Sequence, residues 1–186
     1  MSPTEWFAWG QILFGILVCV PFLAQDWRNR GWIARYPMPS CPPVGSSTLP
    51  KMTIIVCARD EAGVIEGKLA DLSKQDYPRD LLEVLVVDTG SIDSTLTLVE
   101  EWKQKDDDLG SIIRCLSTGG MTGKSTGVNL GLSEAAEDSE VIMLSDADSR
   151  LVEGALERVG RWFLNPDIGA VCGRQNPLGA DGDLHT

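Results

Sequence analysis

The sequence predicts an α/β protein whose mostly parallel sheet carries helices on both faces and is preceded by one transmembrane helix. Short apolar runs alternate with longer segments in which apolar residues recur every three or four positions, the pattern of strands alternating with amphipathic helices. Polar clusters come directly after the apolar runs, and a long stretch near the start of the chain holds no charged residue. Alternation of this kind is typical of a parallel sheet that helices cover on both sides.

Residues 6–24 are expected to form a transmembrane anchor. They hold no charged residue, and at a rise of about 1.5 Å per residue they are long enough to cross a hydrocarbon core of about 30 Å. A cleaved signal peptide is the alternative, but Glu5 is the only charged residue before the stretch, so the positive segment that begins such peptides is missing. Arg28, Arg30 and Arg35 follow the stretch. The positive-inside rule then predicts an N-terminus outside the membrane and the rest of the chain in the cytoplasm.

Residues 25–50 are expected to form a juxtamembrane linker because they become rich in Pro and Ser, which leaves residues 51–186 as the soluble domain. Five apolar runs of this domain are expected to be strands, at Met52–Ala58, Leu82–Val87, Ile112–Leu116, Val141–Leu144 and Ile168–Cys172. Four segments between them are expected to be helices, at Val64–Gln75, Ser94–Lys105, Ser125–Ala136 and Glu153–Phe163.

The composition excludes several classes of function. The formal net charge of −11 argues against a nucleic-acid partner, which needs a basic stripe to neutralise phosphates. The five cysteines form no C-x-x-C pair, so they indicate neither a zinc site nor a disulfide framework. The only histidine is His185, which excludes a histidine-based catalytic triad. An anionic ligand would need positive potential from a metal, a lysine or a helix N-terminus.

Each of the first four expected strands is followed by a polar cluster. The clusters are Arg59–Glu61, Asp88–Ser91, Gly119–Lys124 and Asp146–Asp148. Because ligands gather outside the carboxyl ends of the strands in such sheets, we expect all four clusters to line one rim and to bind a metal-bound, phosphate-containing ligand. Two carboxylates one residue apart, Asp146 and Asp148, can share or flank one hard divalent cation. The alternative is a turn that only caps the next helix, since Asp and Ser favour such turns.

Six blocks of the sequence resemble, in order, the donor-binding half of family 2 glycosyltransferases, which have the GT-A fold for nucleotide-diphospho-sugars. The blocks occupy residues 53–61, 75–78, 83–95, 123–132, 146–149 and 168–173 and read TIIVCARDE, QDYP, EVLVVDTGSIDST, GKSTGVNLGL, DADS and IGAVCG. The resemblance covers nearly all of residues 52–174 and implies a Rossmann-like GT-A domain that is incomplete in this chain. Together with the expected anchor, it points to membrane-bound members that build polysaccharides or glycolipids.

The resemblance also implies roles for individual residues. The implied donor-binding residues are Ala58, Arg59, Glu61, Asp88, Gly90, Lys124 and Asp146. Asp88 would accept a hydrogen bond from the base, although Thr89 stands where the family has a second acidic residue. Asp146 would face the ribose or the sugar, and Asp148, with Asp146, would hold an Mg²⁺ or Mn²⁺ ion that bridges the diphosphate and assists the leaving group. No residue here matches the family's catalytic base, which is expected beyond Thr186.

The resulting expectation is a glycosyltransferase, or its N-terminal fragment, that transfers a hexosyl or N-acetylhexosaminyl group with inversion to a polysaccharide, lipid or other acceptor. The expected donor is a UDP-sugar, with a GDP-sugar as the second option, and the catalytic domain is expected to face the cytoplasm. The alternative is a truncated, catalytically incompetent, membrane-tethered module that binds nucleotide-sugars. A P-loop-like NTPase is more remote, because Thr118 stands where the motif that ends in Gly123-Lys124-Ser125 requires its first Gly.

Overall fold

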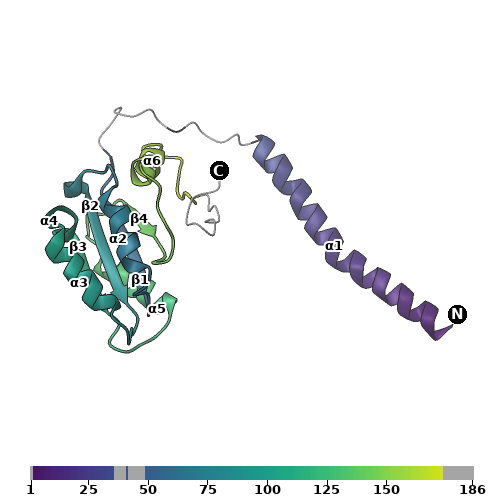
Figure 1. Cartoon of the computed structure of the whole chain (residues 1–186). Coiled ribbons are helices and arrows are strands. Elements are labelled where there is room, and N and C mark those ends of the chain that lie inside the picture. Colours follow the sequence, from purple (N-terminus) through teal and green to yellow (C-terminus); the bar gives the residue numbers. More distant parts are fainter. Residues whose placement is uncertain (1, 36–40, 42–48, 174–186) are drawn as a thin grey trace. The chain divides into compact units, whose positions relative to one another are not determined.

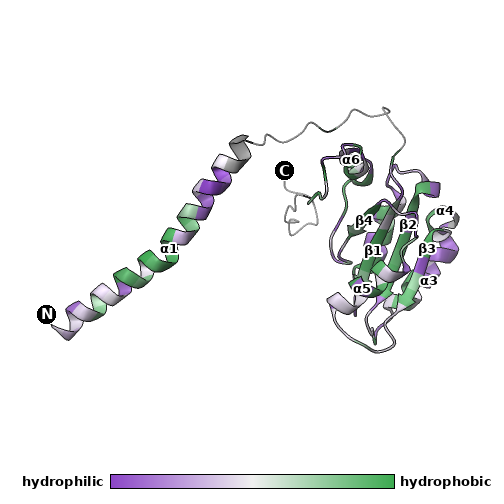
Figure 2. Cartoon of the chain, turned by 180° about the vertical axis from the view of Figure 1, so that it is seen from behind, coloured by the Kyte–Doolittle hydropathy of each residue, from purple (hydrophilic) through white to green (hydrophobic). Residues whose placement is uncertain are grey.

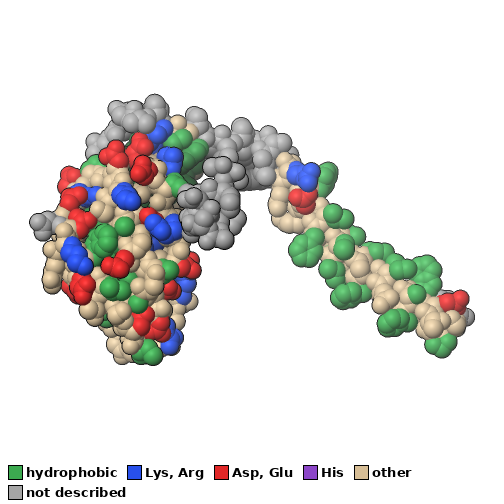
Figure 3. Space-filling view, viewed as in Figure 1, with side chains coloured by type: hydrophobic (Ala, Val, Ile, Leu, Met, Phe, Trp, Pro, Cys, Tyr) green, Lys and Arg blue, Asp and Glu red, His purple; other side chains and the backbone are tan. Residues whose placement is uncertain are grey.

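The computed structural model describes residues 2–35, 41 and 49–173 and divides into two units, Met1–Ser40 and Cys41–Thr186. The first unit contains α1 (Pro3–Arg35), a helix of 33 residues that is largely hydrophobic (Figure 2). Its large apolar side chains from Trp6 to Trp27 are exposed (Figure 3). Its segment Pro3–Gly31 is long and apolar enough to cross a membrane, a test that a signal sequence also passes.

The helix α1 extends beyond the predicted anchor, so residues 25–35 are helical although they were expected to begin the linker. An ion pair one turn apart, between Arg30 Nε and Asp26 Oδ2 at 2.8 Å, supports the helix there. Residues 36–40 and 42–48 of the expected linker lie outside the described residues.

Within the described residues, the second unit is built around a four-stranded parallel sheet of order β3-β2-β1-β4 (Figure 1). The strands are β1 (Met52–Ala58), β2 (Leu82–Asp88), β3 (Ile113–Ser117) and β4 (Val141–Leu144). The helices are α2 (Ile65–Ser73), the 3₁₀ turn η1 (Arg79–Leu81), α3 (Thr95–Lys105), α4 (Asp107–Gly110), α5 (Lys124–Glu134) and α6 (Ala155–Trp162). The first four predicted strands and the four predicted helices are therefore confirmed, with ends that shift by at most two residues.

The two faces of the sheet are buried against different helices. Side chains of β1 and β2 that point to one face pack with α2, α3, α4 and α6 in the larger core cluster. The alternating side chains Ile55, Leu85 and Val87 point to the other face and pack with Leu130 of α5. The prediction of helices on both faces is confirmed, and it explains why these strands are continuous apolar runs.

Two glycines let α5 lie directly against the sheet. A Cβ atom on Gly131 would stand 2.6 Å from Ile55 Cγ2, and one on Gly127 would stand 2.7 Å from Thr89 Cγ2. Both distances are shorter than real contacts allow, so any side chain there would force the helix away from the strands. Because α5 begins at Lys124, this close packing also determines where Lys124 lies.

The predicted strand Ile168–Cys172 is wrong. Residues 168–173 form no regular element, and Gly169, Ala170 and Val171 are exposed. A parallel strand needs a neighbouring strand with which it pairs. Both of its faces must also be covered by other parts of the protein. In the described part of the chain this segment has neither, and its glycines weaken a strand further.

A matched pair of helical glycines tests the packing of α5. Gly131→Ala should lower the free energy of unfolding by about 1–3 kcal/mol, because the methyl group overlaps the buried Ile55 side chain. Gly67→Ala in α2 should raise it by about 0.5–1 kcal/mol, because its methyl group meets only Arg150 at an ordinary 3.5 Å and Ala favours helix. Urea unfolding of the full chain in detergent measures both, and equal effects would contradict this account.

Candidate functional site

The order of the strands places the topological switch point of the sheet between β1 and β4. The chain adds β2 and β3 on one side of β1 and then returns to place β4 on the other side. In open α/β sheets, ligands bind at such a switch point, outside the carboxyl ends of the strands. Since all pairs are parallel, the four predicted polar clusters do lie at the same edge of the sheet.

Hydrogen bonds join the turn after β1 to the turn after β2. The backbone N–H of Asp60 donates to Ser91 Oγ at 3.0 Å, and the N–H of Ile92 donates to Asp60 Oδ1 at 2.8 Å. Asp60 has a φ of 56°, which a non-glycine residue adopts rarely, and these two bonds hold it there. The N–H of Glu61 donates to Thr95 Oγ1 at 2.9 Å. The predicted residues Arg59 and Glu61 thus stand on a fixed loop.

Asp88 is buried at the end of β2 and shapes the turn that follows it. Its Oδ2 accepts the N–H of Gly90 at 3.3 Å, and its Oδ1 accepts the N–H of Ser91 at 3.1 Å. Gly90 has a φ of 93°, which explains the glycine. The carbonyl of Ala58 accepts the N–H of Thr89 at 3.0 Å, which continues the pairing of β1 with β2. A carboxylate has further lone pairs, so the contact of Asp88 with a base stays a prediction.

The structure joins the clusters that follow β3 and β4 directly. Lys124 Nζ lies 2.5 Å from Asp146 Oδ1, and both side chains are exposed. This hydrogen bond raises the pKa of Lys124, so the lysine is a cation at neutral pH. Asp148 is exposed as well, and with Asp146 it lines an open hollow of about 1170 Å³ that extends over β4 and α6.

A buried lysine lies behind this acidic turn. Lys68 of α2 is completely buried, and its Nζ donates to Ser145 Oγ and to Ser149 Oγ, each at 2.9 Å. Burial lowers the pKa of Lys68 to about 8, although the negative charges of Asp71, Asp146 and nearby Asp148 act in the opposite direction. The ammonium therefore remains mostly protonated at pH 7.

A second contact from α2 holds the chain just after the turn. Arg150 donates from Nε and Nη2 to the two carboxylate oxygens of Asp71, at 2.6 and 2.7 Å, and the N–H of Leu151 donates to Asp71 at 3.0 Å. Burial alone would raise the pKa of Asp71, but the hydrogen bonds from Arg150 and Leu151 outweigh it and hold that pKa below its ordinary value.

The sequence analysis missed Lys68 and Asp71 as parts of the site. Both belong to the helical window whose apolar residues include Leu69 and Leu72, and Asp71 and Lys68 are buried with them. Charged residues among the buried positions of an amphipathic helix are unusual unless they are paired. That pattern is the signal that could have identified them, but it does not reveal the partners, which lie 77 to 81 residues away along the chain.

The carboxylates of the acidic turn fit a divalent cation in part. Among the described residues, no group of three or more His, Cys, Asp or Glu side chains is placed to hold a metal ion. Asp146 and Asp148 supply two hard oxygen donors on one turn. Mg²⁺ is usually bound through one or two carboxylates together with substrate phosphates and water. The residues present therefore fit an ion that arrives with a diphosphate better than one that the protein holds alone.

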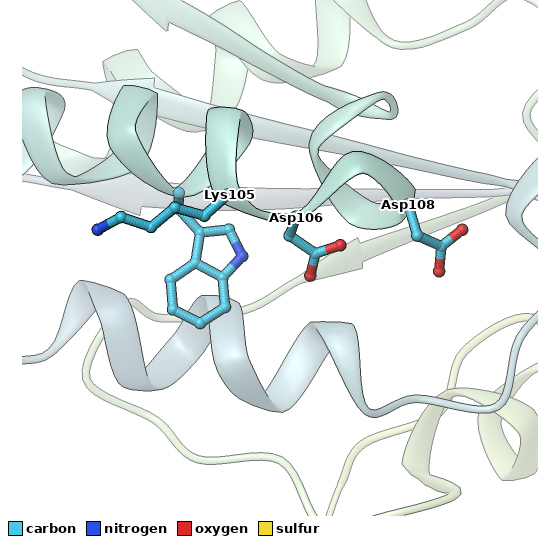
Figure 4. Close-up of a pocket in the computed structure, with 4 residues that line it drawn as sticks. Lys105, Asp106 and Asp108 are labelled. Atoms are coloured by element: carbon cyan, nitrogen blue, oxygen red, sulfur yellow. The ribbon is translucent and has the colours of Figure 1, made fainter.

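A separate hollow of about 510 Å³ lies next to α3 and α4, lined by Trp102, Lys105, Asp106 and Asp108 (Figure 4). Lys105 extends away from the two acidic side chains (Figure 4). The segment that lines it precedes β3, so the hollow lies toward the amino ends of the strands, away from the four clusters. None of the predicted site residues contributes to it.

This fold, with its polar clusters at the carboxyl edge of the strands, defines the class of α/β proteins whose sheets bind ligands at the switch point. The chain belongs to glycosyl transferase family 2, whose sequence profile matches residues 53–183. The family resemblance inferred from the six sequence blocks is confirmed, and it favours this class over the P-loop-like alternative.

Curated relatives show the same affiliation. The chain is 32% identical over 139 residues to the probable glycosyltransferase YdaM of Bacillus subtilis. The aligned region covers 74% of this chain and 32% of that protein. It is 31% identical over 122 residues to the beta-monoglucosyldiacylglycerol synthase of a Synechocystis strain. The aligned region covers 66% of this chain and 25% of that protein. The chain thus spans about a third or less of the length of these relatives.

Solved structures confirm the fold. A mannosyltransferase from Pyrobaculum calidifontis, PcManGT, solved in complex with GDP-Man and Mn²⁺, matches with a TM-score of 0.71 and 31% identity over 85% of this chain and 44% of its own. TarS 1–349 of S. aureus in complex with UDP-GlcNAc matches with a TM-score of 0.51 and 25% identity over 68% of this chain and 37% of its own. The second unit therefore has the GT-A fold, of which this chain covers a part.

The Asp71–Arg150 contact predicts a pH-dependent stability. The pKa of Asp71 is lower in the folded chain, so its contribution to stability is complete above the unfolded pKa of about 3.9 and is lost as the pH falls through the folded pKa. Asp71→Asn should cost about 1–3 kcal/mol at pH 7 and less at pH 3, because below a pH of about 3.9 the unfolded wild-type chain gains a proton on Asp71 more readily than the folded chain does. Urea unfolding in detergent across this range measures the difference, and a cost independent of pH would refute the account.

Proposed function

We propose that this chain is the donor-binding part of a membrane-anchored family 2 glycosyltransferase. It binds a nucleotide-diphospho-sugar together with Mg²⁺ or Mn²⁺, and the enzyme transfers the sugar with inversion to a polysaccharide, lipid or other acceptor. The observation that carries the proposal is the exposed pair Asp146 and Asp148 at the switch point, with Lys124 Nζ 2.5 Å from Asp146. Support comes from the family match and from the neighbour that is in complex with GDP-Man and Mn²⁺.

The charges of the site suit a diphosphate. Lys124 is an exposed cation at the first residue of α5, where the free backbone N–H groups of a helix also favour an anion. Because Lys124 already occupies one side of Asp146, Asp148 is the carboxylate left open to the hollow. When bound, the divalent ion supplies Lewis-acid assistance to the departing nucleoside diphosphate. Asp146 then orients the ribose or sugar, and Lys124 neutralises the phosphates.

The nucleoside binds beside the joined turns after β1 and β2. Those turns present Arg59 and Glu61 from one side and the buried carboxylate of Asp88 from the other. Their backbones are fixed by the bonds of Asp60 and Gly90. A preformed rim of this kind binds a rigid base and ribose without a large ordering cost.

Sugar, acceptor and catalytic base follow from the family and remain proposals. The neighbours are in complex with GDP-Man and UDP-GlcNAc, which supports a hexosyl or N-acetylhexosaminyl group on UDP or GDP. A relative named beta-monoglucosyldiacylglycerol synthase supports a lipid acceptor. We place the catalytic base in the part of these longer proteins that the chain does not cover.

Replacing Asp148 tests the metal-dependent donor site. Asp148→Asn should weaken UDP or GDP binding at saturating Mn²⁺ by about 10-fold or more, because an amide keeps the shape but not the charge. Binding measured in EDTA should change little. Asp138→Asn is the control, since Asp138 is an exposed acid paired with Lys51 before the amino end of β4. Calorimetric titration of the full chain in detergent gives both affinities. If Asp148→Asn binds with unchanged affinity in Mn²⁺, the acidic turn only caps the next helix and the metal site is refuted.

A reporter fusion tests the proposed orientation. Arg28, Arg30 and Arg35 follow the apolar stretch of α1, so the domain should face the cytoplasm. Green fluorescent protein fused after Gly45 should fluoresce, whereas alkaline phosphatase at the same position should be inactive. The reverse result would place the domain outside.

A further inference from the structure

We propose that Lys68 is a positioning residue of the donor site. It sets the geometry of the Asp146 and Asp148 carboxylates because it holds the turn that carries them from its buried side. The inference rests on the proposed function, because it concerns the same metal-dependent site. Lys68 touches neither carboxylate through any described hydrogen bond, and it acts through Ser145 and Ser149.

The acidic turn has an inward and an outward side. Ser145 and Ala147 are buried and Ser149 is half-buried, whereas Asp146 and Asp148 between them are exposed. The two carboxylates therefore project to the same outward side, and the inward side determines their spacing.

One ammonium group fastens this inward side at both ends. Lys68 Nζ donates to Ser145 Oγ before the two acids and to Ser149 Oγ after them, each at 2.9 Å. Ser149 in turn bonds the carbonyl of Asp146, from its Oγ at 2.8 Å and from its N–H at 3.2 Å. These bonds connect α2 to both ends of the turn and to the carbonyl of Asp146. Loss of the Lys68 ammonium group should therefore let the backbone of Asp146 and Asp148 move.

The next turn of α2 strengthens the same attachment. Asp71 follows Lys68 by three residues, so both side chains leave the same side of the helix. Asp71 binds Arg150 and the N–H of Leu151, directly after the acidic turn. The whole segment from Ser145 to Leu151 is thus held by two charged residues of α2.

Burying the charged ammonium group of Lys68 costs free energy unless its hydrogen bonds offset the loss of water. An ammonium group without water needs hydrogen-bond partners and nearby negative charge. Methionine has a similar length and would fill the same space without that cost. The two serine bonds and the overlying acids explain a lysine, and residues that orient metal ligands in this way typically change metal affinity about 10–100-fold when replaced.

Nucleotide titrations with and without metal distinguish positioning from simple packing. The full chain in detergent is titrated with UDP and with GDP, once at saturating Mn²⁺ and once in EDTA. Lys68→Met should weaken binding in Mn²⁺ by about 10-fold or more and change binding in EDTA less than about 2-fold. Ser145→Ala, which keeps the buried charge, should act in the same direction. Lys51→Met, the same substitution at the lysine paired with Asp138, should change neither affinity.

Hydrogen exchange of the metal-free chain provides a readout that does not involve the nucleotide. In Lys68→Met, the backbone N–H groups of residues 145–151 should exchange faster, while those of β2 should keep their protection. Equal loss in both regions would show that Lys68 only stabilises the core and would overturn the inference.

The remaining outcomes are also decisive. If Lys68→Met does not fold, Ser145→Ala decides, since it removes one bond and keeps Lys68. The inference is wrong if both variants bind as the unaltered chain does, or if they lose affinity equally with and without Mn²⁺. If the unaltered chain shows no Mn²⁺-dependent binding of UDP or GDP, the proposed function itself fails, and the inference fails with it.

Discussion

The pairing of β4 with β1 is the constraint on which the candidate site depends. Residues Met52–Ile55 pair in parallel with Val141–Leu144, and the N–H of Ser145 continues the ladder to Ile55 at 3.0 Å. The ladder therefore ends directly before Asp146, which places the acidic turn at the same edge of the sheet as the turn after β1. It also brings the turn over α2, which follows β1, so that Lys68 and Asp71 can reach it. One strand pairing thus assembles residues nearly 80 positions apart.

Two lysines act on opposite sides of the acidic turn in a chain whose net charge is −11. Lys124 is exposed and pairs with Asp146, which raises its pKa, whereas burial lowers the pKa of Lys68 to about 8. Exposed pairs contribute little to stability, so Lys124 is free to exchange Asp146 for a ligand. A buried ammonium is held firmly by its partners and suits a structural task. In the site that we propose, Lys124 therefore binds the ligand in front of the turn, and Lys68 positions the turn from behind.

The sequence was sufficient for the parts of the fold that local patterns determine. Periodicity located β1 and β4 to the residue, and strand–helix alternation predicted a parallel sheet with its polar clusters at one edge. Ile168–Cys172 was misassigned because an apolar run forms a strand only where a neighbour can pair with it. Lys68 could not be placed, because its partners Ser145 and Ser149 become neighbours only through the pairing of β4 with β1. The extension of α1 to Arg35 was missed because composition alone suggested a linker.

Paramagnetic broadening by Mn²⁺ tests the central claim most directly. In amide NMR spectra of the full chain in detergent with UDP or GDP, substoichiometric Mn²⁺ broadens signals close to its binding site. The account predicts selective broadening of residues 145–150 and of the turns that follow β1 and β3, with the signals around the hollow of Trp102 and Asp108 preserved. Broadening centred on Trp102 and Asp108, or broadening without selectivity, would contradict a metal–diphosphate site at the switch point of the sheet.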